Sequence, residues 1–219
     1  GSEVTEMDSL EIAYTNITEL NAFNVITTIH SQLRIAFNHS ITDISGLQNL
    51  ETIDNVDPGC DFFEPGCYEP DFVIQNHNAL IDVSGFSNLE RVQTTLRIQD
   101  NPALTDISGF AALTQVDDYV YINSNNDLTD ISGFDVLDTV GRYVSIDNND
   151  ALTDIAGFNA LETGGVWIQH ADLLEDVSGF ASLTTISSDG LLIQYNPALI
   201  SFAGLANVTS AVGQIGIVD

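Results

Sequence analysis

The chain has 219 residues and carries 32 acidic side chains against four basic ones, for a formal net charge of -28. A surface this acidic repels phosphate groups, which argues against nucleic-acid binding and against association with anionic membranes. No apolar run is long enough to span a bilayer, so we expect no membrane insertion by this domain. The charge also leads us to expect a saline setting or bound divalent cations, with an acidic surface kept for solubility as the alternative.

The first part of the chain, residues 10–53, holds two copies of one pattern. In each copy, an apolar-x-isoleucine alternation ending at Ile12 or Ile35 predicts a short strand with both apolar side chains facing inward. A compact turn follows each strand. Gly46 in the second turn takes the position that Ala22 holds in the first, which indicates an internal repeat.

An insertion at about 54–71 interrupts this repeat, because the spacing from Gly46 to Gly85 is much longer than the spacing between later turn glycines. Long insertions in a solenoid protrude as loops and often carry binding, although a loop packed on the flank is the alternative. Cys60 and Cys67 are close enough for a local disulfide, which would favour an oxidising compartment; a metal-binding pair is the weaker alternative. The candidate ligand contacts in the loop are Phe62, Phe63 and Tyr68.

Seven further strands are predicted in the rest of the chain. Their isoleucines are Ile74, Ile98, Ile122, Ile146, Ile168, Ile193 and Ile217. The full unit, at residues 110–133, reads Phe-x2-Leu-x2-Val-x3-Val-x-Ile-x2-Asn-x2-Leu-x-Asp-Ile-Ser-Gly. One such turn cannot bury its apolar face alone, so stacked turns must share one core.

The sequence therefore predicts a mostly β, right-handed solenoid of leucine-rich-repeat or parallel β-helix-like type. We expect about nine turns of roughly 24 residues each, a period within the range of leucine-rich repeats. The solenoid forms one domain over residues 1–219, with repeats at about 10–217.

Two polar columns run along the repeat. Three residues after the strand isoleucine stand inward asparagines that we expect to satisfy backbone groups, at Asn38, Asn101, Asn125, Asn149 and Asn196. His77 and Ala171 break this column. An acid precedes the Ser-Gly turn, at Glu19, Asp43, Asp82, Asp106, Asp130, Asp154 and Asp176. We expect these acids to accept backbone N–H bonds, with bridging calcium as the alternative; no other cofactor is predicted.

Side chains that alternate with the inward strand positions form an outward face, where we expect a ligand to bind. Exposed rings and polar side chains on such a face suit a sugar or a protein loop. The candidate contacts there are Arg97, Tyr121, Trp167, His170 and Tyr195. For Trp167 a packing role is the alternative. A column of amides on this face is either a binding surface or a ladder that stabilises the sheet.

The repeated unit resembles that of the receptor L domain family, leucine-rich-like solenoids of growth-factor receptor ectodomains with related modules in fungal and bacterial surface proteins. The resemblance covers roughly residues 10–217. It implies an extracellular or cell-surface, ligand-binding or adhesive role without catalysis. The chain lacks the cysteine-rich modules of receptor ectodomains, which favours a microbial surface protein.

Together these features predict a non-enzymatic cell-surface or secreted recognition module whose partner is an extracellular protein or glycan. The main alternative is a structural spacer or stalk in a larger surface protein. A polysaccharide-active enzyme is the second alternative. The four histidines form no catalytic or metal-binding motif, and the absence of lysine and scarcity of arginine argue against a lyase.

Overall fold

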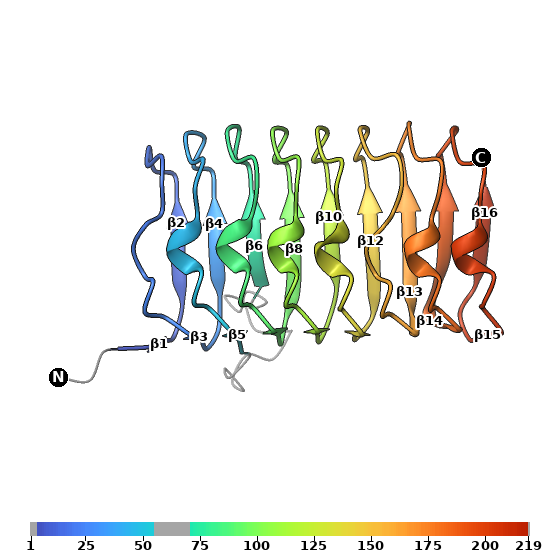
Figure 1. The fold of residues 1–219 in the computed structure, drawn as a ribbon, viewed down its shortest axis with the longest axis horizontal. Coiled ribbons are helices and arrows are strands. Elements are labelled where there is room, and N and C mark those ends of the chain that lie inside the picture. Colours follow the sequence, from blue (N-terminus) through green and yellow to red (C-terminus); the bar gives the residue numbers. More distant parts are fainter. Residues whose placement is uncertain (1–3, 55–70, 219) are drawn as a thin grey trace, which may run out of the picture.

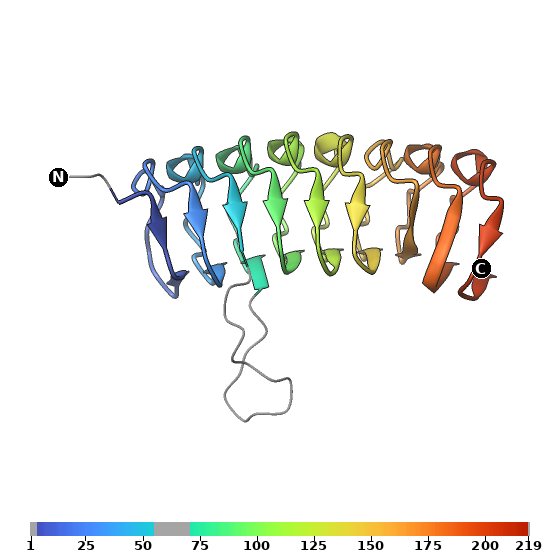
Figure 2. The ribbon, with the colours of Figure 1, turned by 90° about the horizontal axis from the view of Figure 1, so that it is seen from below.

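A computed structural model describes residues 4–54 and 71–218 of the chain. Within these ranges the chain winds into a mostly β solenoid of about 8 turns. Figures 1 and 2 show the turns following one another along one axis, with the two termini at opposite ends. The predicted mostly β solenoid, with its ~24-residue spacing, is therefore confirmed, with about 8 turns where about nine were expected. In the described part of the chain, none of the helices is long and apolar enough to cross a lipid bilayer.

One large parallel sheet carries the predicted strands. They are β2 (Leu10–Ala13), β4 (Leu33–Ala36), β6 (Asp71–Gln75), β8 (Thr95–Gln99), β10 (Val120–Asn123), β12 (Tyr143–Asp147), β13 (Thr163–Gln169), β14 (Thr185–Gln194) and β16 (Ile215–Val218). Each strand pairs with the next, and Ile122 lies opposite both Ile98 and Ile146. The register shifts between β13 and β14, at Gly164 and Val166. From Ile35 to Ile193 the isoleucine column exposes at most 2% of any side chain, which confirms its place in the core.

A smaller parallel sheet forms on a second side of the turns. Its strands are β1 (Glu6–Met7), β3 (Thr28–Ile29), β5 (Thr52–Ile53), β7 (Arg91–Val92), β9 (Gln115–Val116) and β11 (Thr139–Val140). In these turns a bend separates the short strand from the inner strand, as at residues 117–119. The bend is lost in the shortened repeat between Gly157 and Gly179. The short and inner strands merge there into β13, and also in β14, which pairs with the last short strand β15 (Ser210–Ala211).

A 3-10 helix forms at the Ser-Gly turn of most repeats and lies in front of the large sheet in Figure 1. These helices are η1 (Ser45–Leu47), η2 (Ser84–Phe86), η3 (Ser108–Phe110), η4 (Ser132–Phe134), η5 (Ser178–Phe180) and η6 (Ala203–Leu205). The acid before the turn accepts a backbone hydrogen bond, as where Ser132 N–H donates to Asp130 Oδ1 at 2.8 Å. Asp43, Asp82, Asp106 and Asp176 accept in the same way, which supports the predicted turn role of the acid column.

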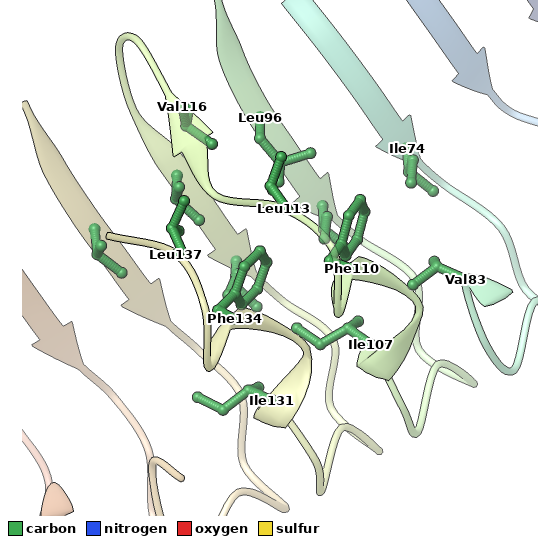
Figure 3. Close-up of a cluster of buried hydrophobic side chains, with 14 of the residues drawn as sticks. Ile74, Val83, Leu96, Ile107, Phe110, Leu113, Val116, Ile131, Phe134 and Leu137 are labelled. Carbon is green, nitrogen blue, oxygen red and sulfur yellow. The ribbon is translucent and has the colours of Figure 1, made fainter. Parts of the chain in front are cut away.

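The phenylalanine after the turn glycine builds the centre of the core. Phe86, Phe110, Phe134, Phe158 and Phe180 are fully buried and stack in sequence, with ring centroids 5.2 to 5.5 Å apart. Figure 3 shows two of these rings, Phe110 and Phe134, with the leucines and valines that surround them. Near-parallel rings at this spacing match the rise between turns, so one ring per turn fills the interior without gaps.

The glycine of each turn marks the closest approach between neighbouring repeats. A Cβ on Gly133 would lie 2.0 Å from the carbonyl oxygen of Ile107, and one on Gly109 would lie 2.1 Å from that of Val83. No side chain fits at such a contact. Ala22 occupies the corresponding position one turn before Gly46.

The asparagine column is buried and linked from turn to turn. Asn125 Nδ2 donates to the carbonyl oxygen of Ile98 at 3.0 Å, and its Oδ1 accepts the backbone N–H of Asn101 at 3.2 Å. His77 takes the same role in its turn, because Nε2 lies 3.1 Å from the Ile35 carbonyl oxygen and Nδ1 accepts the Asn38 N–H at 3.4 Å. The break at His77 is thus a substitution that still satisfies the backbone.

Candidate functional site

Amide side chains on the outer face of the large sheet bond to one another. Gln99 Nε2 donates to Gln75 Oε1 at 2.8 Å, and Gln194 Nε2 donates to Gln169 Oε1 at 2.7 Å. Each bond joins neighbouring turns and uses side-chain groups that a ligand would otherwise contact. These bonds support the sheet-stabilising role of the amides, which is one of the two roles the sequence allowed.

Four aromatic side chains gather on the same face around β10, β12 and β13. We call this group, Tyr119, Tyr121, Tyr143 and Trp167, the aromatic cluster. The Tyr143 ring stacks on Trp167 with 4.2 Å between ring centroids, and its hydroxyl lies 2.5 Å from that of Tyr121. Tyr119 packs edge-on against Tyr143 at 4.6 Å. The rings therefore form one connected patch that crosses three turns of the solenoid.

Two arginines flank the aromatic cluster, each over a tyrosine ring. The guanidinium of Arg97 lies 4.5 Å from one ring centroid, and its Nε donates to Asp71 Oδ2 at 2.7 Å. Arg142 lies 4.9 Å from a second centroid, with its Nε 3.8 Å from Asp189 Oδ1. The side chain of Arg142 is 54% exposed. Stacking on the rings holds both guanidinium groups in place beside them.

The shortened repeat is what allows the cluster to form. Gly165 stands opposite Tyr143 in the sheet, and a Cβ on Gly165 would lie 2.8 Å from the Cβ atoms of both Tyr143 and Asp189. A larger residue would push these two side chains apart. In the next turn Gly190 adopts a φ of +82°, and the preceding Asp189 carbonyl accepts the Trp167 Nε1–H bond at 3.1 Å. The indole is thus fixed on one edge by the backbone and on one face by Tyr143.

Two tyrosines of the cluster, Tyr143 and Tyr119, have raised pKa values. Burial raises the pKa of the Tyr143 hydroxyl well above its ordinary value of 10.0, with the hydrogen bond to Tyr121 acting in the same direction. Burial also raises the pKa of Tyr119, and the neighbouring Asp118 carboxylate adds to that effect. At physiological pH Tyr119 and Tyr143 therefore offer uncharged hydroxyl groups.

A shallow hollow of about 210 Å³ adjoins the aromatic cluster on the side of the last two turns. Trp167 lines it together with the polar residues Asp189 and Gln214 and the apolar residues Leu192 and Ile215. Apolar walls with a few convergent polar groups are typical of ligand sites. The hollow is small, with room for one ring-sized group.

His170 and Tyr195 form a separate pair just beyond the ends of β13 and β14. Their rings stack with centroids 4.9 Å apart, and His170 Nδ1 lies 2.9 Å from Asp147 Oδ1. Tyr195 is half exposed. Both residues adopt positive φ, near 50° and 57°, at the corner where the chain leaves the sheet. The pair flanks the outer face. Among the described residues, neither ring stacks on a ring of the aromatic cluster.

The structure brings some of the predicted residues together and leaves others apart. Arg97, Tyr121 and Trp167 lie in one patch, while His170 and Tyr195 lie beside it. The predicted loop contacts Phe62, Phe63 and Tyr68, and the proposed disulfide between Cys60 and Cys67, fall outside the described residues. Sequence reasoning missed Tyr119, Tyr143, Arg142 and Asp189.

A signal for these missed residues was present in the sequence. Tyr119 and Tyr143 occupy the outward position two residues before Tyr121 and Ser145, in neighbouring turns. Extending the outward columns by one further position would have placed both tyrosines next to each other. Asp189 was not accessible to such reasoning, because the irregular pairing between Gly164 and Val166 shifts the register there.

Acidic side chains on the described residues do not come together as metal ligands would. No group of three or more His, Cys, Asp or Glu side chains in these ranges is placed to hold an ion. Members of the regular acid column instead point their carboxylates back at their own turns. The calcium alternative thus has no candidate site in residues 4–54 and 71–218.

Comparison with known proteins gives little further identification. No family model matches the chain, and no curated protein matches it. Among solved structures, an internalin from Listeria monocytogenes is similar over 97% of this chain, at 17% sequence identity and a TM-score of 0.42. The chain spans 62% of the length of that internalin. A TM-score this low carries no inference about family or ligand, so the leucine-rich-repeat-like description rests on the chain's own strands and turns.

Proposed function

We propose that this chain is a non-enzymatic recognition module, displayed at a cell surface or secreted, that binds an uncharged glycan through the aromatic cluster. The observation that supports this most directly is the stacked Tyr143–Trp167 pair beside a hollow edged by Asp189 and Gln214. Aromatic rings pack against the C–H faces of sugar rings, and carboxylate, amide and guanidinium groups hydrogen-bond to sugar hydroxyls. Both kinds of group are present here side by side.

The charge of the whole protein narrows the ligand class. A net charge of -28 repels carboxylated or sulfated sugars over distances set by the ionic strength. Neutral phenol hydroxyls and the partly exposed Arg142 supply donors without adding negative charge. An extracellular protein that inserts an aromatic or polar side chain into the hollow is the other ligand class for this patch.

A binding role fits the patch better than catalysis. Hydrolysis of a glycosidic bond generally uses two carboxyl groups that flank the scissile bond. Here two acids near the cluster each face an arginine, Asp71 with Arg97 and Asp189 with Arg142. A third, Asp118, accepts a hydrogen bond from the Thr95 hydroxyl. We also propose that the chain is similar to the receptor L domain-like microbial surface proteins, and the repeat unit is the observation that supports this.

The first test is the variant Trp167→Ala in a glycan array followed by calorimetry with the best neutral oligosaccharide. Removing the indole face should weaken binding at least tenfold, or about 1.4 kcal/mol. Tyr14→Ala is the matched control, because Tyr14 is an exposed ring (74%) that stacks on Phe37 at the far end of the same face. Melting temperatures of both variants should remain within a few degrees of the parent.

The outcomes separate the candidate functions. Equal loss of binding in both variants would contradict a site at the cluster. Binding of an extracellular protein but no glycan, lost in Trp167→Ala, would keep the site and change the ligand class. No ligand of either class, with unchanged melting, would favour the structural spacer, for which the regular amide and asparagine ladders are the supporting observation.

A further inference from the structure

His170 is held on the outer face of the large sheet, where the aromatic cluster also lies. Asp147 points outward from that sheet, because it follows the buried Ile146 in β12 and strand side chains alternate. One carboxylate oxygen, Oδ1, lies 2.9 Å from His170 Nδ1, and the other accepts a hydrogen bond from Asn123 at 3.1 Å. Asn123 thus fixes the carboxylate, and the carboxylate fixes the imidazole on this face.

The imidazole still has a surface that a ligand can reach. The ring stacks on that of Tyr195 with 20° between the planes, yet the His170 side chain is 47% exposed. Its Nε2 bonds to none of the described residues, so this nitrogen can bond to a ligand hydroxyl. His170 therefore offers a ring and a polar atom together, as the aromatic cluster does.

His170 and Trp167 lie in line along β13 and its end. Three residues of extended chain separate them by roughly 10 Å, which is about the length of two sugar units in a linear chain. Gln169 lies between them on the same face and is half-buried. Its carbonyl oxygen accepts a hydrogen bond from Gln194, whereas its amino group donates to no described residue and can bond to a ligand hydroxyl.

The ring contacts of Trp167 also set a direction for a ligand that extends beyond the hollow. Tyr143 covers one face of the indole at 4.2 Å, so a sugar packed on the hollow side cannot continue across the cluster towards β12. The strand direction remains open, because the half-buried Gln169 and the exposed His170 follow Trp167 along the chain.

We propose that the ligand is a linear, uncharged oligosaccharide of at least three units that runs along β13, with His170 as its second subsite. This inference rests on the proposed binding of a glycan at the aromatic cluster. One sugar ring occupies the hollow against Trp167, a middle unit lies over Gln169, and a third unit packs on the imidazole and bonds to its Nε2.

The test is calorimetry with cello-, manno- and xylo-oligosaccharides of two to six units, which are linear and uncharged. A chain of two units reaches only the hollow and Gln169, whereas a chain of three or four also reaches His170. For the series that binds, we expect the affinity of the parent to rise about tenfold from two units to four and then to level off.

The variant His170→Asn should remove most of this rise and leave the affinity for two units unchanged. Asparagine holds the same corner position at Asn76 and Asn148, with φ of 59° and 53°, so the backbone accepts the change. The matched control Asp100→Asn places the same residue at that corner three turns earlier, and its length dependence should equal that of the parent. Melting temperatures of both variants within a few degrees of the parent exclude unfolding as the cause.

The outcomes distinguish this inference from the proposed function. Binding that is lost in Trp167→Ala but does not depend on chain length would overturn the second subsite and leave the proposed function intact. The same conclusion follows if His170→Asn keeps the full rise, or if Asp100→Asn loses it equally. If no oligosaccharide of any length binds, the proposed glycan function fails and this inference fails with it.

Discussion

His77 stands where other turns have a buried asparagine. Because histidine can be protonated, this position makes the stability of the fold depend on pH. Burial lowers the pKa of His77 below its ordinary value of 6.5, although the carbonyl oxygens of Ile35 and Asn38, which would accept bonds from a protonated ring, oppose the shift. The unfolded chain therefore takes up a proton near pH 6.5 that the folded chain binds only at lower pH. The stability that depends on neutral His77 is complete above pH 6.5 and is lost as the pH falls towards the folded pKa.

The variant His77→Asn should remove the pH-dependent part of the stability that comes from His77. An amide at this position restores the pattern seen at Asn101 and Asn125. We expect the parent to lose up to about 1.4 kcal/mol per pH unit relative to the variant between pH 6.5 and the folded pKa. Urea unfolding of both proteins at pH 7.5 and 5.5 measures this difference directly. If the free energy of unfolding changed with pH equally in parent and variant, His77 would not be the source of the pH dependence.

At the scale of single residues, the sequence was informative where a position repeats. The inward asparagines, isoleucines and phenylalanines recur once per turn, so their burial follows from the repeat alone. Trp167 occurs once, and its partners come from a neighbouring turn and from the backbone of Asp189. A contact that depends on one irregular turn has no second copy in the sequence to reveal it.

The turn element depends on the close approach at its glycine. In the variant Gly133→Ala the new methyl group would lie 2.0 Å from the Ile107 carbonyl oxygen, so two backbone segments must move apart. We expect a loss of about 2–3 kcal/mol in the free energy of unfolding. Gly164→Ala is the control, because its Cβ meets nothing nearer than a Leu161 methyl group at 3.4 Å. Chemical denaturation of both variants tests this, and equal losses would contradict it.

At the scale of elements, the strands of the large sheet were predictable, whereas the short strands of the smaller sheet and the helices were not. Period-two alternation marks the strands of the large sheet. A two-residue strand such as β9 or a single 3-10 turn such as η3 is too short to show a period. The merging of the two sheets at β13 could be anticipated only in part. The shorter spacing from Gly157 to Gly179 signalled a change in that turn. It did not reveal that Gly164 and Gly165 would replace a bend and bring Tyr143 onto Trp167.

The whole molecule carries far more negative than positive charge, and each of its four arginines faces an acid. The remaining carboxylates repel one another along the stack. Raising NaCl from 0.01 M to 0.15 M shortens the screening length from about 30 Å to about 8 Å. We therefore expect the melting temperature to rise by several degrees. Calcium chloride at equal ionic strength should give a similar rise, and a much larger one would instead indicate a specific calcium site.

The direction of the backbone hydrogen bonds has a mechanical consequence. In Figure 1 the strands lie across the long axis, so the bonds that join one strand to the next run along it. Tension applied between the two termini therefore acts on the interfaces between successive turns in series. Each turn contacts only the turns next to it, so each interface can separate without disturbing the others. The chain would extend by peeling turn after turn from an end, each releasing a similar length of polypeptide. Such a rod yields in small steps under load rather than by one abrupt rupture.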